Sequence, residues 1–210
     1  MNPNTQPAVS SAASRTLTVE VLAAAVLVVL IILSRWTIDV PNFQPVMAIA
    51  LLAGFLFHRQ WLGIVAIISG MLFADAWIGF YEIGLTAVVY LALALPLIGG
   101  LLLRRWKQQP FRFVTGMLGF AGLAAVNFYL MTNLAVWAFT DWYPDSAVGL
   151  GMALWAGLPF LKWTLLGNLT FTTILMGLPA MGTCSLPWPS RSLHVMKSAA
   201  PPATTPVFVR

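Results

Sequence analysis

Six apolar stretches, with charges sorted to alternate sides of them, constrain the fold of this 210-residue chain most strongly. Hydrophobic residues make up 60% of the sequence and charged residues 8%, whereas soluble domains carry roughly 25% charged residues. The mean hydropathy of +0.86 agrees with a chain that is largely solvated by lipid. The sequence therefore predicts an all-α, polytopic membrane protein built as a six-transmembrane-helix bundle.

The predicted spans follow from the rule that a membrane helix needs about 20 mostly apolar residues. They lie near 17–34, 45–57, 61–81, 83–103, 113–140 and 152–178. Within the fourth, Pro96 and Gly99-Gly100 predict a bend. The membrane domain is thus expected to cover 17–178, between a disordered cytoplasmic N-terminus at 1–16 and an irregular cytoplasmic tail at 179–210, both rich in small and polar residues.

The basic residues set the predicted orientation. With the N-terminus inside, the outer segments hold a single basic residue, Arg35, alongside four acidic ones. The cytoplasmic segments hold nine basic residues, namely Arg15, Arg59, Arg104, Arg105, Lys107, Arg112, Arg191, Lys197 and Arg210. Short loops rich in Lys and Arg stay in the cytoplasm, so both termini are predicted to be cytoplasmic.

Composition and motifs narrow the function classes. The positive-inside bias explains the net charge of +5, and no patch suited to nucleic acid is present. The single cysteine, Cys184, cannot form an internal disulfide, and neither His58 nor His194 has the neighbours of a metal site. No HExxH, GxSxG or GxxxxGK[ST] motif occurs. We therefore expect no enzyme activity, no metal and no cofactor.

Polar and aromatic residues gather in the predicted outer half of the bundle. A binding site is an apolar, aromatic cavity with a few polar groups that orient the ligand. The predicted ligand-binding residues are Asn42, Asp75, Tyr81, Asn133, Trp137 and Trp155. The alternative for the aromatic residues is a belt at the membrane interface.

Two charged residues fall inside predicted spans, Asp75 in the third and Lys162 in the sixth. Charges within a membrane are costly and usually face the bundle interior and pair with each other. Asp75 and Lys162 are therefore predicted to form an ion pair, which either locks the bundle or faces a ligand cavity. The remaining alternative is that Lys162 extends to the interface without a partner.

Several segments resemble a known family. They are Asn42-Phe43-Gln44-Pro45-Val46, Ala74-Asp75-Ala76-Trp77-Ile78-Gly79-Phe80-Tyr81, Thr132-Asn133-Leu134-Ala135-Val136-Trp137, Gly157-Leu158-Pro159-Phe160 and Leu165-Leu166-Gly167-Asn168. They resemble an uncharacterised family of small bacterial six-span membrane proteins, which is similar to the substrate-binding (S) components of energy-coupling-factor vitamin transporters. This resemblance implies a bacterial inner-membrane protein that binds a vitamin or precursor near its outer face.

The same resemblance implies a partner, a transmembrane coupling subunit driven by ATPases. S components often dock through an Ala-xxx-Ala pattern on the first span. Here Ala23, Ala24 and Ala25 are followed four residues later by Leu27, Val28 and Val29, which leaves a different partner, or none, open.

Three functions are weighed on these grounds. The first is a transporter subunit that captures a small vitamin-like solute, indicated by the polar and aromatic cluster. The second is a non-transporting scaffold of the cell envelope, which would need no cavity. The third is an ion- or proton-coupled carrier that uses Asp75 and would need an inward-facing pathway. Beyond the solute and a coupling subunit, the expected partner is the lipid bilayer.

The orientation can be tested with a reporter that is active only outside the cytoplasm, fused after Ala200. We expect no signal, because the basic residues place the C-terminus inside. A strong signal would require an odd number of spans and contradict the six-span topology.

Overall fold

A computed structural model describes the chain from residue 6 to residue 180, with side chains from 16 to 177. The described residues are all-α, with no strand among them. Seven α-helices follow in order: α1 (Gln6–Thr37), α2 (Val46–Leu56), α3 (Gln60–Ile78), α4 (Ile83–Ala92), α5 (Ala94–Leu103), α6 (Pro110–Phe139) and α7 (Ala147–Ala180). A short 3-10 turn, η2 (Arg104–Trp106), follows α5. The predicted all-α architecture is confirmed.

Five helical segments in the described part of the chain are long and apolar enough to cross a membrane: Thr16–Thr37, Gln60–Ile78, Ile83–Trp106, Pro110–Phe139 and Ala147–Gly177. The second predicted span, 45–57, corresponds to α2 (Val46–Leu56) and, like its predicted range, is too short to cross a membrane by itself. Helix α2 has 11 residues and is therefore only about 16 Å long, roughly half of the 30 Å hydrocarbon core.

The outer boundaries of the predicted domain also differ. Helix α1 begins at Gln6 and therefore includes most of the segment 1–16, which was predicted to be disordered. This segment contains Ala8, Ala12 and Ala13, and alanine has the highest helix propensity. The predicted irregular tail, 179–210, lies outside the described residues except for the last two residues of α7.

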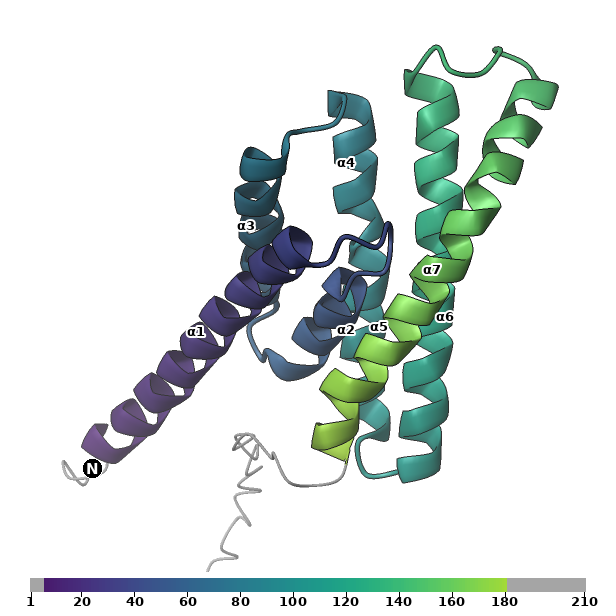
Figure 1. Cartoon of the computed structure of the whole chain (residues 1–210). Helices are drawn as coiled ribbons and strands as arrows, with labels where there is room; N and C mark the ends of the chain where they lie inside the picture. The colour runs from purple at the N-terminus through teal and green to yellow at the C-terminus, as the bar shows by residue number, and fades with distance from the viewer. Residues whose placement is uncertain (1–5, 181–210) are drawn as a thin grey trace, which may run out of the picture.

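Helix α2 occupies the centre of the bundle (Figure 1). The α1–α3 pair lies on one side of it, and the long α6–α7 hairpin lies on the other. Every residue from Val46 to Gly54 is buried, as expected of a helix surrounded by protein. Its closest neighbour is α5: a Cβ added to Gly54 would lie 1.9 Å from the Leu97 carbonyl oxygen, and one added to Gly100 would lie 1.9 Å from that of Leu51. Two glycines thus allow backbone contact between the helices.

A buried helix end must find partners for its last carbonyl groups, and Arg104 supplies them for α2. Its Nε donates to the Phe55 carbonyl oxygen at 3.0 Å, and its Nη2 donates to that of Gly54 at 2.6 Å. Nη2 also donates to the Phe57 carbonyl oxygen. A cation at a helix C-terminus is further favoured by the helix dipole.

Glu20 of α1 completes this end. Its Oε1 accepts a hydrogen bond from the His58 backbone N–H at 2.8 Å, and its Oε2 lies 3.7 Å from Nη1 of Arg59. Glu20 is buried although it stands near the start of a predicted span. Arg59 and Arg104, which the charge pattern assigned to cytoplasmic segments, therefore also stabilise the junction between α2 and α3.

The predicted bend in the fourth span is confirmed as a break at Leu93, between α4 and α5. Pro96 lies three residues later; it has no N–H, and its ring would crowd the carbonyl of Ala92 in a continuous helix. The break lets α4 pack against α6 while α5 follows α2.

Replacing Arg104 tests whether it stabilises the end of α2. Arg104→Ala leaves three buried carbonyls without their donor and should lower the free energy of unfolding by about 2–4 kcal/mol. Unfolding of the purified protein in mixed micelles measures the change. Arg105→Ala is the matched control, because Arg105 is exposed and should have little effect. Equal losses in the two variants would show that Arg104 does not support α2.

Candidate functional site

The loop between α1 and α2, residues 38–45, begins the candidate site. The Phe43 N–H donates to the Val40 carbonyl oxygen at 3.2 Å, which closes a four-residue turn with Pro41 and Asn42 at its centre. Asn42 has a positive φ of 61°. Asparagine tolerates this left-handed conformation better than most residues, and proline favours the position before it. Asn42, predicted to bind ligand, therefore also shapes the turn.

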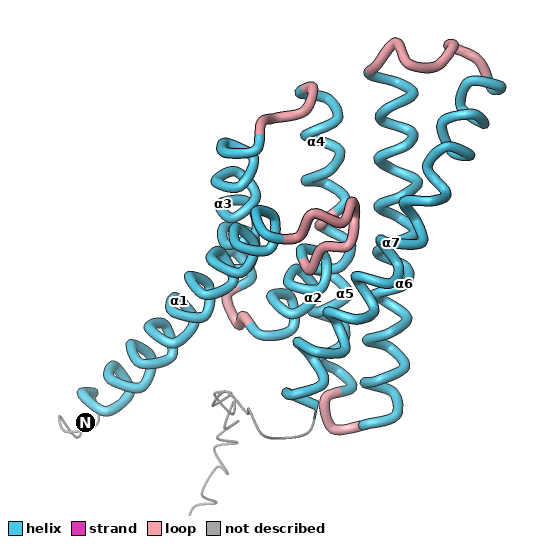
Figure 2. Tube along the Cα trace, in the orientation of Figure 1, coloured by secondary structure: helices cyan, strands magenta, loops and turns pink. Residues whose placement is uncertain are grey.

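Phe43 anchors this loop on α7. Its ring centroid lies 5.3 Å from that of Phe171 and 6.4 Å from that of Trp163. Between them, Gly167 leaves space for the backbone, since a Cβ there would lie 3.0 Å from the Phe43 Cα. Figure 2 shows the loop in pink, crossing the middle of the molecule toward α7. The loop thus joins the two sides of the bundle.

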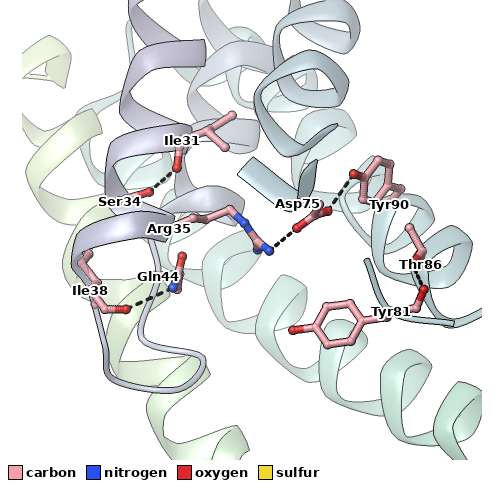
Figure 3. A network of polar contacts seen from close by, with 9 residues as sticks. All are labelled: Ile31, Ser34, Arg35, Ile38, Gln44, Asp75, Tyr81, Thr86 and Tyr90. Atoms are coloured by element: carbon pink, nitrogen blue, oxygen red, sulfur yellow. Dashed lines mark hydrogen bonds and ion pairs between the residues drawn. The ribbon is translucent and has the colours of Figure 1, made fainter. Parts of the chain in front are cut away.

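Asp75 of α3 is buried and bonded through both carboxylate oxygens (Figure 3). Oδ1 forms an ion pair with Nη2 of Arg35 at the end of α1, and Oδ2 accepts a hydrogen bond from the Tyr90 hydroxyl of α4 at 2.7 Å. The Asp75 side chain is 3% exposed and that of Arg35 is 15% exposed. This network ties three helices together in an apolar bundle.

The predicted pairing of Asp75 with Lys162 is wrong. Lys162 is exposed on the surface of α7, where its Nζ lies 5.1 Å from the Trp163 ring centroid. Two residues further, Thr164 is buried and faces the interior. Because each helical residue turns by about 100°, residues 162 and 164 point in nearly opposite directions. Helix phase therefore excludes the predicted ion pair.

A small cavity of about 70 Å³ lies beside the Arg35–Asp75 pair. It opens among α1, α2, α3, α4, α6 and α7, so six helices and the α1–α2 loop meet there. Its polar lining comes from Arg35, Asn42, Gln44 and Thr164. The apolar lining consists of Val46, Met47, Met71, Val89, Leu93 and Phe128. An apolar cavity with a few polar groups has the character of a ligand site.

Two residues of this lining each carry a buried polar atom that lacks a hydrogen-bond partner among the described residues, Nε of Arg35 and Oε1 of Gln44. Most buried polar atoms in proteins are paired, so such atoms require an explanation. Gln44 is otherwise engaged through its Nε2, which donates to the Ile38 carbonyl oxygen at 3.4 Å. One donor and one acceptor thus remain on residues that line the same cavity.

The predicted ligand residues separate into two groups. Asn42 lines the cavity, and Asp75 forms an ion pair with Arg35, which also lines the cavity. Tyr81 and Trp155 are 57% and 77% exposed on the surface of the bundle. None of the lining comes from Tyr81, Asn133, Trp137 or Trp155, so their predicted convergence with Asn42 and Asp75 on one cavity is not what the structure shows.

Asn133 and Trp137 instead form contacts within the α6–α7 hairpin. The Asn133 Nδ2 donates to the Tyr129 carbonyl oxygen at 2.8 Å, and its side-chain carboxamide occupies the space where Gly157 has no Cβ. Trp137 donates from Nε1 to the Pro144 carbonyl oxygen at 3.0 Å in the hairpin loop. These polar groups are used for packing.

The ligand-binding residues predicted from sequence did not include Arg35, Gln44, Tyr90 or Thr164. A signal for Arg35 was present, because it is the one basic residue that the charge pattern places on the outer side. An exception of this kind indicates a residue with a specific acidic partner. Within the described residues, no group of three or more His, Cys, Asp or Glu side chains lies close enough to hold a metal ion.

A double-mutant cycle tests the Arg35–Asp75 pair. Asp75→Asn and Arg35→Met should each lower the free energy of unfolding by about 3 kcal/mol, because each leaves the other charge buried alone. The double variant should lose less than the sum of the two, as measured by unfolding in mixed micelles. Lys162→Met is the control and should cost little. Additive losses would show that Arg35 and Asp75 do not interact.

Comparison with known families identifies a match over most of the chain. The model of a family of unknown function, DUF6580, matches residues 15–187, which is most of the chain. No curated protein and no solved structure matches the chain significantly.

Proposed function

The chain belongs to the DUF6580 family, and from the geometry of its cavity we propose that it captures a small polar solute as the substrate-binding subunit of a membrane transporter. The solute would enter the cavity between the α1–α2 loop and α7. This proposal places the protein in a bacterial inner membrane and gives it the role of an S component, as the resemblance of its motifs implies.

One observation carries the proposal: buried charges stand beside a cavity that is lined by two residues with unsatisfied polar atoms, Arg35 and Gln44. Charged residues in a membrane bundle are costly, and they commonly mark substrate pathways. A purely structural ion pair would be expected to have its remaining donors satisfied. Here the Nε of Arg35 has no partner among the described residues, and that is consistent with a ligand that supplies one.

The size of the cavity restricts the solute. Ligand pockets usually measure about 300–1,000 Å³, far more than the 70 Å³ found here. The cavity as it stands suits a very small solute or the polar end of a larger one. A vitamin-sized molecule would require the α1–α2 loop to move away from α7. Phe43 is the loop's aromatic anchor on α7, so release of this ring would open the cavity.

A transport cycle would also need an energy source. The sequence contains no phosphate-binding motif, so ATP-driven work would require a partner such as a coupling subunit with ATPases. Helix α1 offers a surface for it, because Leu22, Val26, Val29 and Leu33 are exposed along its length. Ala23 and Ala24 instead pack against the core, so they do not provide a small-residue docking surface.

A scaffold without transport activity is the second candidate, and the α6–α7 hairpin favours it. Tyr129 donates from its hydroxyl to the Leu154 carbonyl oxygen at 2.6 Å, and Asn168 donates from Nδ2 to that of Ala121 at 2.6 Å. Together with Asn133 against Gly157, these contacts fasten the two helices along their length. A scaffold would use this rigid hairpin and would need no ligand.

A ligand screen separates the two functions. Purified protein should show a concentration-dependent rise in Tm with at least one compound from a panel of vitamins, precursors and small polar metabolites, because a ligand stabilises the state that binds it. Arg35→Lys should reduce that rise, whereas Trp155→Ala, on the exposed surface, should leave it unchanged. If no compound raises the Tm of the parent protein, the scaffold becomes the better assignment.

A further inference from the structure

We infer that the cavity recognises an uncharged group that carries both a hydrogen-bond acceptor and a hydrogen-bond donor, such as a carboxamide or a lactam edge. This inference rests on the proposed capture of a solute and adds the chemical class of the group that binds. It depends on three features of the residues that line the cavity, namely the unpaired donor of Arg35, the unpaired acceptor of Gln44 and the balance of charge.

The donor is the Nε–H of Arg35. A guanidinium has five N–H groups in a fixed planar fork, and here the Nη2 end is held by Asp75. That ion pair fixes the direction of the whole plane. The Nε atom is buried, has no partner among the described residues and belongs to a side chain that lines the cavity. A ligand atom that meets it must accept a hydrogen bond.

The acceptor is Oε1 of Gln44. The amide orientation is decided by the Ile38 carbonyl oxygen, which can only accept a hydrogen bond and therefore selects the Nε2 end of the amide. Figure 3 shows the consequence: Oε1 points away from Ile38, toward the side on which the Arg35 side chain lies. This oxygen is buried and unpaired within the described part of the chain. A ligand atom that meets it must donate a hydrogen bond.

The charge balance excludes an anion. Arg35 is the one charged side chain among the described residues that line the cavity, and its charge is already compensated by Asp75. A carboxylate or phosphate would leave an excess negative charge in an apolar bundle, which is strongly unfavourable. A carboxylate would also bring no donor for Gln44. A neutral carboxamide offers an acceptor for Arg35 Nε and a donor for Gln44 Oε1, and it leaves the bundle electroneutral.

The cavity size agrees with such a group. A water molecule takes about 30 Å³ of liquid volume, so 70 Å³ has room for a group of only a few non-hydrogen atoms. Two methionines, Met47 and Met71, line the apolar part, and their flexible side chains can adjust to a small substituent. Acetamide, acetate and acetone have the same number of non-hydrogen atoms and therefore form a matched set of probes.

The test measures the Tm of the purified full-length protein against increasing concentrations of the three probes. We expect acetamide to bind at least tenfold more tightly than acetate, and acetone, which accepts but cannot donate, to fall between them. Arg35→Lys keeps the charge beside Asp75 but removes the Nε–H, and Gln44→Met keeps the length of the side chain but removes the acceptor. Each substitution should weaken the binding of acetamide about tenfold, which corresponds to the loss of one buried hydrogen bond. Thr115→Val, on the exposed surface of α6, is the control.

Each outcome decides between the inference and the function on which it rests. Acetate binding as tightly as acetamide overturns the inference, and this comparison needs no variant to fold. The inference is also overturned if a solute from the ligand screen binds equally well to the Arg35→Lys and Gln44→Met variants. In that case the proposed capture of a solute is retained, but at another site. Selective acetamide binding without any hit from the screen supports the cavity chemistry and removes the transport proposal. Failure of all probes and all solutes overturns both.

Discussion

The absence of water in a membrane interior is the constraint on which this structure depends, and helix α2 meets it in an unusual way. A helix of 11 residues cannot bring both ends to the membrane surfaces, so the bundle itself must satisfy its terminal backbone groups. Arg104 does this for the carbonyls at one end, and Glu20 for the following His58 N–H. At the other end lies the tight loop at 38–45, which contributes Asn42 and Gln44 to the lining of the cavity.

The position of that loop explains why the motifs of the sequence are far apart in the chain yet meet in space. Asn42 permits the turn, Phe43 packs against α7 and Gln44 donates a hydrogen bond to Ile38 within the loop. Gly167 of a second motif leaves room for the loop backbone. In the same way Asn133 of a third motif fits against Gly157 of a fourth. The residues of these pairs pack against each other, so the presence of most motif residues is explained by packing and requires no ligand.

Two exceptions lie where α1, the loop and α3 meet, and two further atoms without a hydrogen-bond partner among the described residues, Glu20 Oε2 and Gln60 Oε1, lie near the α2–α3 junction. Asp75 holds the Nη2 end of Arg35 and leaves its Nε unpaired, and the Ile38 carbonyl holds one end of the Gln44 amide and leaves the other unpaired. Two side chains are thus oriented by protein contacts and incompletely satisfied. A preorganised pair of this kind differs from the α6–α7 contacts, in which the polar groups bond to the neighbouring backbone.

Apolar runs and prolines were enough to predict from sequence the all-α architecture, the break before Pro96 and six apolar segments, five of which form helices long enough to cross a membrane. These features depend on local composition and on the missing N–H of proline. Asp75 was also recognised as a residue that needs a partner. The identity of that partner was decided by tertiary structure alone, since Arg35 and Lys162 are both basic and only helix phase and crossing place Arg35 beside it. The same is true of the cavity, whose lining comes from six helices and one loop.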